Sequence, residues 1–159
     1  MTAPPNRESP LIDVAPVSAA IMRLAHEQRA VAANRLAALG LFPGQELVLA
    51  QLWASDGRSQ KELVDSLQLD HSTVAKSVQR LERAGLVDRT RSATDGRVML
   101  VSLTAAGRTL EEPVRDIWAD LEARWAARLS PPELARFSEL AARLGRSQPV
   151  VGPSDRQPD

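Results

Sequence analysis

The stretch that decides the fold runs from residue 59 to residue 103 and reads SQKELVDSLQLDHSTVAKSVQRLERAGLVDRTRSATDGRVMLVSL. Its first half contains two short segments with the apolar spacing of helices, joined at Gln68 and Leu69. Its second half contains two strand-like segments, Leu86–Thr90 and Val98–Leu103, on either side of a tip that includes a glycine. Two helices followed by a hairpin predict a winged helix-turn-helix, in a fold that is mainly α-helical with a small β-wing.

Capping residues mark where these two helices begin and end. Ser59, followed three residues later by Glu62, forms a capping-box pattern that predicts a helix start at Ser59. Asp70 is a favourable N-cap for the second helix, because its carboxylate can accept a hydrogen bond from a free backbone N–H. Gly85 suits the left-handed conformation that often ends a helix. The second helix is therefore expected over residues 71–84.

The second helix separates apolar from polar side chains. At 100° per residue, Val74, Val78 and Leu81 share one face. The opposite half has six side chains that can all hydrogen-bond and that include no acid: Ser72, Thr73, Lys76, Gln79, Arg80 and Arg83. Side chains of these types read base edges and hold phosphates in protein–DNA complexes. The alternative is an ordinary solvated helix face, but the hairpin that follows favours the DNA interpretation.

Positive charge is concentrated in the same region. Between His71 and Arg97 there are three acidic residues and six basic ones: Lys76, Arg80, Arg83, Arg89, Arg91 and Arg97. The whole chain, in contrast, has 20 basic and 20 acidic residues and a formal net charge of zero. A neutral chain with one basic patch favours a single docking surface for DNA over a general coating of nucleic acid.

Short motifs follow one another in a fixed order between residues 44 and 107. They are Gly44-Gln45-Glu46, Ser59-Gln60-Lys61-Glu62-Leu63, Ser72-Thr73-Val74, Arg80-Leu81-Glu82, Gly85-Leu86-Val87, Asp95-Gly96-Arg97 and Leu103-Thr104-Ala105-Ala106-Gly107. In this order and spacing they resemble the MarR family of bacterial transcription regulators. The resemblance implies a homodimeric repressor or activator that binds double-stranded DNA at a pseudo-palindromic operator, with dimerisation helices at both ends of the chain.

The tip of the hairpin matches the Asp-x-Arg pair of that family at Asp95 and Arg97. The resemblance implies that the Asp95 carboxylate holds the Arg97 guanidinium, which then enters the electronegative minor groove. The alternative is a hairpin salt bridge without a role in DNA binding. We expect base contacts from Ser72, Thr73, Lys76 and Gln79, and phosphate contacts from Arg80, Arg83, Arg89 and Arg91.

The segments outside the winged region complete the domain organisation. We expect a disordered tail over 1–16, an N-terminal dimerisation helix over 17–40, the DNA-binding domain over 41–103, C-terminal dimerisation helices over 104–146 and a second disordered tail over 147–159. Pro113 is expected to bend a long helix that begins at Thr104. Amphipathic helices at opposite chain ends favour pairing with a second copy of the chain, and the alternative is that they fold back onto their own chain.

A site for a small effector is a further expectation from the resemblance. Members of the family often bind an aromatic or anionic molecule between the dimer helices and the winged domain, which releases the DNA. The candidates here are His26, Arg29, Phe42 and Trp53. His26 and Arg29 share a helix face, and a cation pair beside an indole suits an aromatic carboxylate. The structural alternatives are a core position for Trp53, a surface position or an interhelical hydrogen bond for His26, and a solvated Arg29.

Composition excludes several other classes of protein. The chain has no cysteine, which removes disulfides, zinc fingers and thiol-based redox sensing. No run of about 18 apolar residues predicts a membrane span, and residues 1–16 lack a signal-peptide core, so we expect a cytoplasmic protein. No phosphate loop, nucleophile motif or metal-ligand spacing is present, so we expect neither an enzyme nor a cofactor. The alternative function is a winged helix that binds protein instead of DNA, although that predicts an acidic or apolar second helix.

Overall fold

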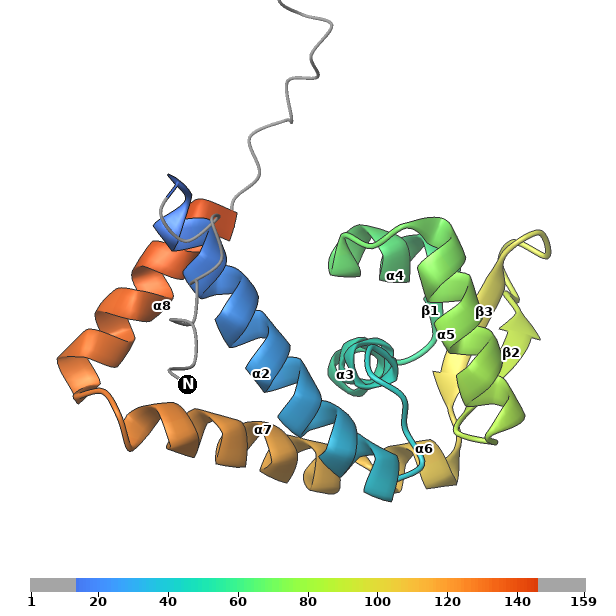
Figure 1. The fold of residues 1–159 in the computed structure, drawn as a ribbon. Coiled ribbons are helices and arrows are strands. Elements are labelled where there is room, and N and C mark those ends of the chain that lie inside the picture. Colours follow the sequence, from blue (N-terminus) through green and yellow to red (C-terminus); the bar gives the residue numbers. More distant parts are fainter. Residues whose placement is uncertain (1–13, 146–159) are drawn as a thin grey trace, which may run out of the picture. The chain divides into compact units, whose positions relative to one another are not determined.

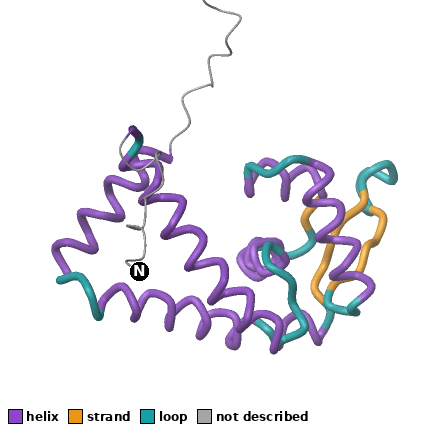
Figure 2. Tube along the Cα trace, viewed as in Figure 1, coloured by secondary structure: helices purple, strands orange, loops and turns teal. Residues whose placement is uncertain are grey.

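A computed structural model describes residues 14–145 of the chain, most of which are helical (Figures 1 and 2). A three-stranded antiparallel sheet accompanies the helices, so the expected fold class is confirmed. The chain divides after Ala119 into two compact units, each with its own packing. None of the helices in the described part has both the length and the apolar character needed to cross a bilayer.

Helices α4 (Gln60–Leu67) and α5 (His71–Arg83) form the expected helix-turn-helix in the first unit. The Ser59 hydroxyl oxygen accepts a hydrogen bond from the Glu62 N–H at 3.2 Å, and the Glu62 carboxylate accepts one from the Ser59 N–H at 2.7 Å. This confirms the predicted capping box at the start of α4. At the other end Gln68 is left-handed, with φ at 51°, and turns the chain toward α5.

The limits and the inward face of α5 also follow the prediction. Asp70 Oδ1 accepts a hydrogen bond from the Thr73 N–H at 2.9 Å, which makes Asp70 the N-cap. Gly85, with φ at 69°, follows the last turn. The three apolar side chains of the inward face are fully buried: Val74, Val78 and Leu81. Because this face is anchored in the core, the opposite face of α5 is held outward on a fixed support.

The sheet has the strand order β1-β3-β2. Strands β2 (Val87–Arg91) and β3 (Met99–Leu103) pair from Val87 opposite Leu103 to Arg91 opposite Met99, within one residue of the predicted limits. They form the wing. Strand β1 (Arg58–Ser59) pairs with the other edge of β3 and was not predicted, because two residues are too few to show strand alternation.

Helix α3 (Gln45–Ala54) supplies the centre of the core and packs against α4, α5 and β3. Its buried apolar residues are Val48, Leu49 and Leu52. Two polar side chains at its start are also buried, and both accept backbone hydrogen bonds. Gln45 Oε1 accepts from the Phe42 N–H at 2.8 Å, and Glu46 Oε2 accepts from the Gly44 N–H at 2.7 Å. Burial raises the pKa of Glu46 despite its hydrogen bonds.

Helix α2 (Pro16–Ala38) precedes this core and buries Ala32 and Leu36 in its second half. Its first half is different, because three large apolar side chains there are exposed: Val17, Ile21 and Met22. The helix begins at the last residue of the tail predicted over 1–16, and residues 1–13 lie outside the described part of the chain. The start of α2 therefore presents an apolar surface that the described chain leaves uncovered.

The segment after the wing differs from the prediction of one long, bent helix. The structure has two helices instead, α6 (Ala105–Thr109) and α7 (Glu111–Ala126). Thr104 caps the first of them, as expected. Pro113 has no N–H to donate to the carbonyl of Thr109, four residues earlier. Helix α6 therefore ends at Thr109, and a new helix begins at Glu111. Pro113 then lies in the first turn of α7, where a missing N–H is tolerated.

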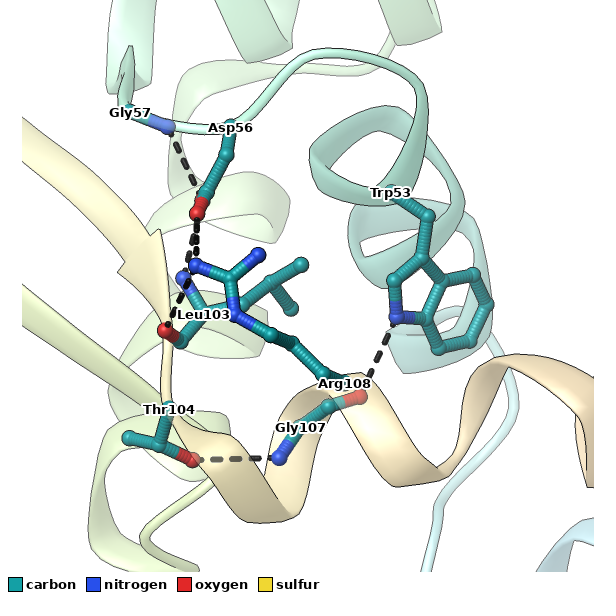
Figure 3. Close-up of polar contacts among 7 residues, drawn as sticks. All are labelled: Trp53, Asp56, Gly57, Leu103, Thr104, Gly107 and Arg108. Atoms are coloured by element: carbon teal, nitrogen blue, oxygen red, sulfur yellow. Dashed lines mark hydrogen bonds and ion pairs between the residues drawn. The ribbon is translucent and has the colours of Figure 1, made fainter.

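Polar contacts fix the corner at which β3 passes into α6 (Figure 3). Asp56 accepts hydrogen bonds from the Leu103 N–H at 2.9 Å and from the Arg108 guanidinium at 2.5 Å. Gly107 has no room for a side chain, because a Cβ there would overlap the Leu86 carbonyl oxygen. These contacts hold the start of α6 against the base of the wing.

The second unit contains the end of α7 and helix α8 (Pro131–Gly145). The Ser130 N–H donates to the Glu133 carboxylate at 2.8 Å, which is the hydrogen bond that a capping box makes at the start of a helix. Three large apolar side chains along α8 are exposed: Phe137, Leu140 and Leu144. The tail predicted over 147–159 lies outside the described residues.

Candidate nucleic-acid interface

The outward face of α5 brings together the six side chains that the sequence singled out. All six are exposed: Ser72, Thr73, Lys76, Gln79, Arg80 and Arg83. The buried face of the same helix fixes their direction, because Val74, Val78 and Leu81 have no exposed surface. The helix therefore presents hydroxyl groups near its start, an amine and an amide in its middle and two guanidinium groups near its end.

Asp70 organises the start of this face. Its carboxylate accepts a hydrogen bond from the Ser72 hydroxyl at 2.6 Å and from the Thr73 hydroxyl at 2.5 Å, in addition to the Thr73 N–H. The bonds from Ser72 and Thr73 hold the pKa of Asp70 well below its usual range. An ionised carboxylate can only accept, so the single hydrogen of each hydroxyl points at Asp70. Ser72 and Thr73 consequently present only acceptor lone pairs outward, which the sequence did not predict.

Arg80, near the end of α5, has an aromatic partner. Its guanidinium carbon lies 5.5 Å from the centre of the Phe42 ring, and the ring itself is 62 % exposed. This distance is within the range of a cation–π interaction. The two residues are 38 positions apart in the sequence, and no local signal connects them. Phe42 therefore belongs with the candidate DNA-binding face of α5.

Two of the arginines on β2, which were expected to hold phosphates, have partners within the chain. Arg89 forms an ion pair with Glu82 at 2.6 Å, and its hydrogen bond to Glu82 is the main reason that the pKa of Glu82 is lowered. Arg91 Nη1 donates to the Gly96 carbonyl oxygen at 2.8 Å across the hairpin. Both side chains thus contribute to the conformation of the wing, and only their remaining donors are available to DNA.

The tip of the wing is organised differently from the expected Asp95–Arg97 side-chain pair. Asp95 Oδ1 accepts a hydrogen bond from the backbone N–H of Arg97 at 3.0 Å. A carboxylate readily reaches the backbone two residues later, which is the geometry of an Asx turn. No carboxylate within residues 14–145 pairs with the Arg97 guanidinium. Asp95 shapes the turn, and the Arg97 side chain extends from it unpaired and exposed.

The four ligand candidates do not meet in the cleft that contains Phe42. That cleft, of about 380 Å³, is lined by Gly40, Phe42, Gln45, Arg80, Arg83 and Ala84. Trp53 instead donates from its indole Nε1 to the Gly107 carbonyl oxygen at 3.1 Å (Figure 3). His26 and Arg29 are both exposed on α2. Of the four candidates, only Phe42 lines this cleft.

Known proteins resemble this chain in the region that contains α5. The model of the MarR family matches residues 39–98. An HTH-type transcriptional repressor of Mycobacterium tuberculosis is 30 % identical over 135 residues, which is 85 % of this chain and 97 % of that protein. A probable transcriptional regulator from Pseudomonas aeruginosa is similar in structure, with a TM-score of 0.71, 33 % identity and coverage of 78 % and 93 % of the two chains. The S. aureus MepR–DNA complex gives a TM-score of 0.75, with 26 % identity and coverage of 80 % and 95 %.

Proposed function

This chain belongs to the MarR family of transcription regulators, and we propose that it represses transcription by binding double-stranded operator DNA as a homodimer. The observation that supports this best is the outward face of α5, where exposed hydroxyl, amide, amine and guanidinium groups stand on a fully buried apolar face. A helix of this kind fits the major groove of B-DNA. The proposed location is the cytoplasm, and the proposed activity is binding without a catalytic step.

The proposed contacts differ along the surface. Ser72, Thr73, Lys76 and Gln79 contact base edges in the major groove. Arg80 and Arg83 hold phosphates, because neither forms an ion pair within the described residues. Arg97, on the turn shaped by Asp95, enters the minor groove. Arg89 and Arg91 make secondary phosphate contacts, since each already has a partner in the chain.

A second copy of the chain is the proposed partner of the exposed apolar side chains. In the first unit one group of them lies at the start of α2, and in the second unit another group lies along α8. Exposed apolar patches of this kind mark interaction surfaces. A twofold-symmetric dimer presents two copies of α5 and would recognise a pseudo-palindromic operator.

An effector remains part of the proposal. We propose that a small aromatic or anionic molecule releases the DNA, with His26, Arg29 and Trp53 as candidate contacts. Phe42 is a separate candidate, because it lies beside Arg80 and Arg83 in the cleft on the DNA-binding side. The alternative function, a winged helix that binds another protein, is supported less well, since the outward face of α5 has no acidic or large apolar residue.

Selection of bound duplexes from a random pool tests the proposal. We expect one enriched sequence with twofold symmetry, and an affinity that falls linearly with the logarithm of salt concentration. Arg115→Ala serves as a control variant, because it removes an exposed arginine of α7 that is not part of the proposed surface, and it should bind the same sequence as the parent protein. If no duplex is enriched at low ionic strength, the protein does not have the proposed function.

A further inference from the structure

We propose that Phe42 is a positioning residue for Arg80, and that the two residues form, with Arg83, a seat for one phosphate of the DNA backbone. The inference rests on the proposed function and deepens it. It adds a residue from the loop between α2 and α3, outside the helix-turn-helix, to the DNA-binding surface.

Phe42 combines a fixed backbone with an exposed ring. Its N–H donates to Gln45 Oε1 at 2.8 Å, and its carbonyl oxygen accepts from the Gln45 N–H at 3.0 Å. The Gln45 side chain is itself buried, with 4 % of its surface exposed. The ring, in contrast, is 62 % exposed and contributes little to the core. An aromatic ring that is exposed on a hydrogen-bonded backbone is suited to contact another surface side chain.

The guanidinium of Arg80 contacts this ring. At 5.5 Å from the ring centre it is within cation–π range. Apart from the contact with the ring, the Arg80 guanidinium forms no hydrogen bond or ion pair within the described residues, so its N–H groups remain available to an anion. Because the ring restricts an otherwise flexible side chain, less conformational entropy is lost when the guanidinium binds a phosphate.

The surroundings of the pair suit a phosphate group. The cleft of about 380 Å³ beside the ring also contains Arg83, so two guanidinium groups border it. None of the residues that line the cleft is acidic. Two guanidinium groups in a lining without an acidic residue favour an anion over a base edge, which offers both donors and acceptors. The Gln45 amide oxygen in the lining is already occupied by the Phe42 N–H.

The test compares two replacements of Phe42 in operator binding, measured by fluorescence anisotropy at several salt concentrations. Phe42→Leu keeps an apolar side chain but removes the π-face, and Phe42→Trp keeps a larger π-face. We expect Phe42→Leu to weaken binding about two- to fivefold per half-site, as expected for loss of an exposed cation–π contact. We expect Phe42→Trp to bind as tightly as the parent protein. Thermal unfolding should be unchanged in both variants, because the ring is exposed.

If Phe42 acts by positioning Arg80, two further results are expected. In an Arg80→Ala background, Phe42→Leu should have no additional effect, because its whole contribution passes through the guanidinium. The salt dependence of binding should also be shallower for Phe42→Leu than for the parent protein. The inference is overturned if Phe42→Leu binds the operator as tightly as the parent protein, or if Phe42→Trp binds as weakly as Phe42→Leu. It is also overturned if the loss of affinity caused by Phe42→Leu adds in full to the loss caused by Arg80→Ala. Parent protein that binds no duplex would instead overturn the proposed function.

Discussion

The end of α5 and the wing are both rich in arginine, but they use it in different ways. Arg80 and Arg83 on the helix form no ion pair within residues 14–145, and Arg80 rests on an aromatic ring. On the strand before the wing tip, Arg89 is paired with Glu82 and Arg91 is bonded to the Gly96 carbonyl. A count of basic residues in the sequence does not distinguish the two arginines on the helix from the two on the strand. We therefore expect Arg80 and Arg83 to contribute more to the attraction for DNA than Arg89 and Arg91, because Arg89 and Arg91 already bind groups of the chain itself.

The largest expected difference is between two double variants. Replacing both helix arginines, Arg80 and Arg83, by alanine should lower operator affinity roughly a hundredfold per half-site and reduce the salt slope by about two per half-site, or about four for the dimer, because each copy of α5 loses two phosphate contacts. Replacing both strand arginines, Arg89 and Arg91, should have a clearly smaller effect on the salt slope. Affinity measured against salt concentration for both variants decides this. Equal slopes for the two double variants would contradict the division between helix and wing.

Arg97 at the wing tip is the exception within the wing, because its guanidinium is unpaired and exposed. Arg97→Ala should weaken operator binding by about 1–3 kcal/mol without a change in folding stability. Asp95→Ala should weaken binding less, since Asp95 acts on the turn through the Arg97 N–H. Titrations of both variants against the same duplex provide the comparison. A larger loss for Asp95→Ala than for Arg97→Ala would show that the shape of the turn matters more than the guanidinium.

The start of α5 offers a test of hydrogen-bond direction. Since the Ser72 and Thr73 hydroxyl groups donate to Asp70, we expect them to accept from the amino groups of adenine or cytosine. Thr73→Val keeps the shape of the side chain and removes the hydroxyl. Removing the amino group from the contacted base should weaken the parent protein by about 1–3 kcal/mol and leave the affinity of Thr73→Val unchanged. Dependence of the parent on guanine O6 or thymine O4 at that position would refute the assigned direction.

The smallest expected effect concerns the ion pair at the base of the wing. The hydrogen bond from Arg89 lowers the pKa of Glu82 below its ordinary value of 4.5. The pair therefore stabilises the fold fully at pH values above 4.5. As pH falls through the lowered pKa, Glu82 is protonated and the stabilisation is lost. The stability difference between the parent protein and Glu82→Gln should therefore shrink in acid, as measured by urea unfolding from pH 7 to pH 3. A difference that is constant over this range would show that the pair does not stabilise the wing.

The parts of this structure that could be predicted depend on neighbouring residues. Ser59 with Glu62, Asp70 and Gly85 define the ends of two helices because capping acts over three or four positions. The apolar face of α5 was predictable for the same reason. Strand β1 was not, because its partner β3 lies about 40 residues further along the chain and two residues show no periodicity.

The details of the candidate site depended more on tertiary contacts. The sequence identified the exposed residues of α5 from their spacing. It could not show that Phe42 meets Arg80 or that Arg89 meets Glu82, since side-chain partners at such separations follow from packing. It also could not distinguish the backbone N–H of Arg97 from its guanidinium as the partner of Asp95. Composition locates the surface, whereas the contacts decide which charges on it are free.

Site-directed cleavage of the operator tests the central claim most directly. The chain has no natural cysteine, so single variants His71→Cys and Ala93→Cys can carry an iron–EDTA reagent at the start of α5 and at the wing tip. Both positions are exposed and neither is a proposed contact. We predict major-groove cleavage from position 71 in each half-site and minor-groove cleavage from position 93 beside it. Cleavage that is absent, or the same from both positions, would contradict the assignment of this surface to DNA.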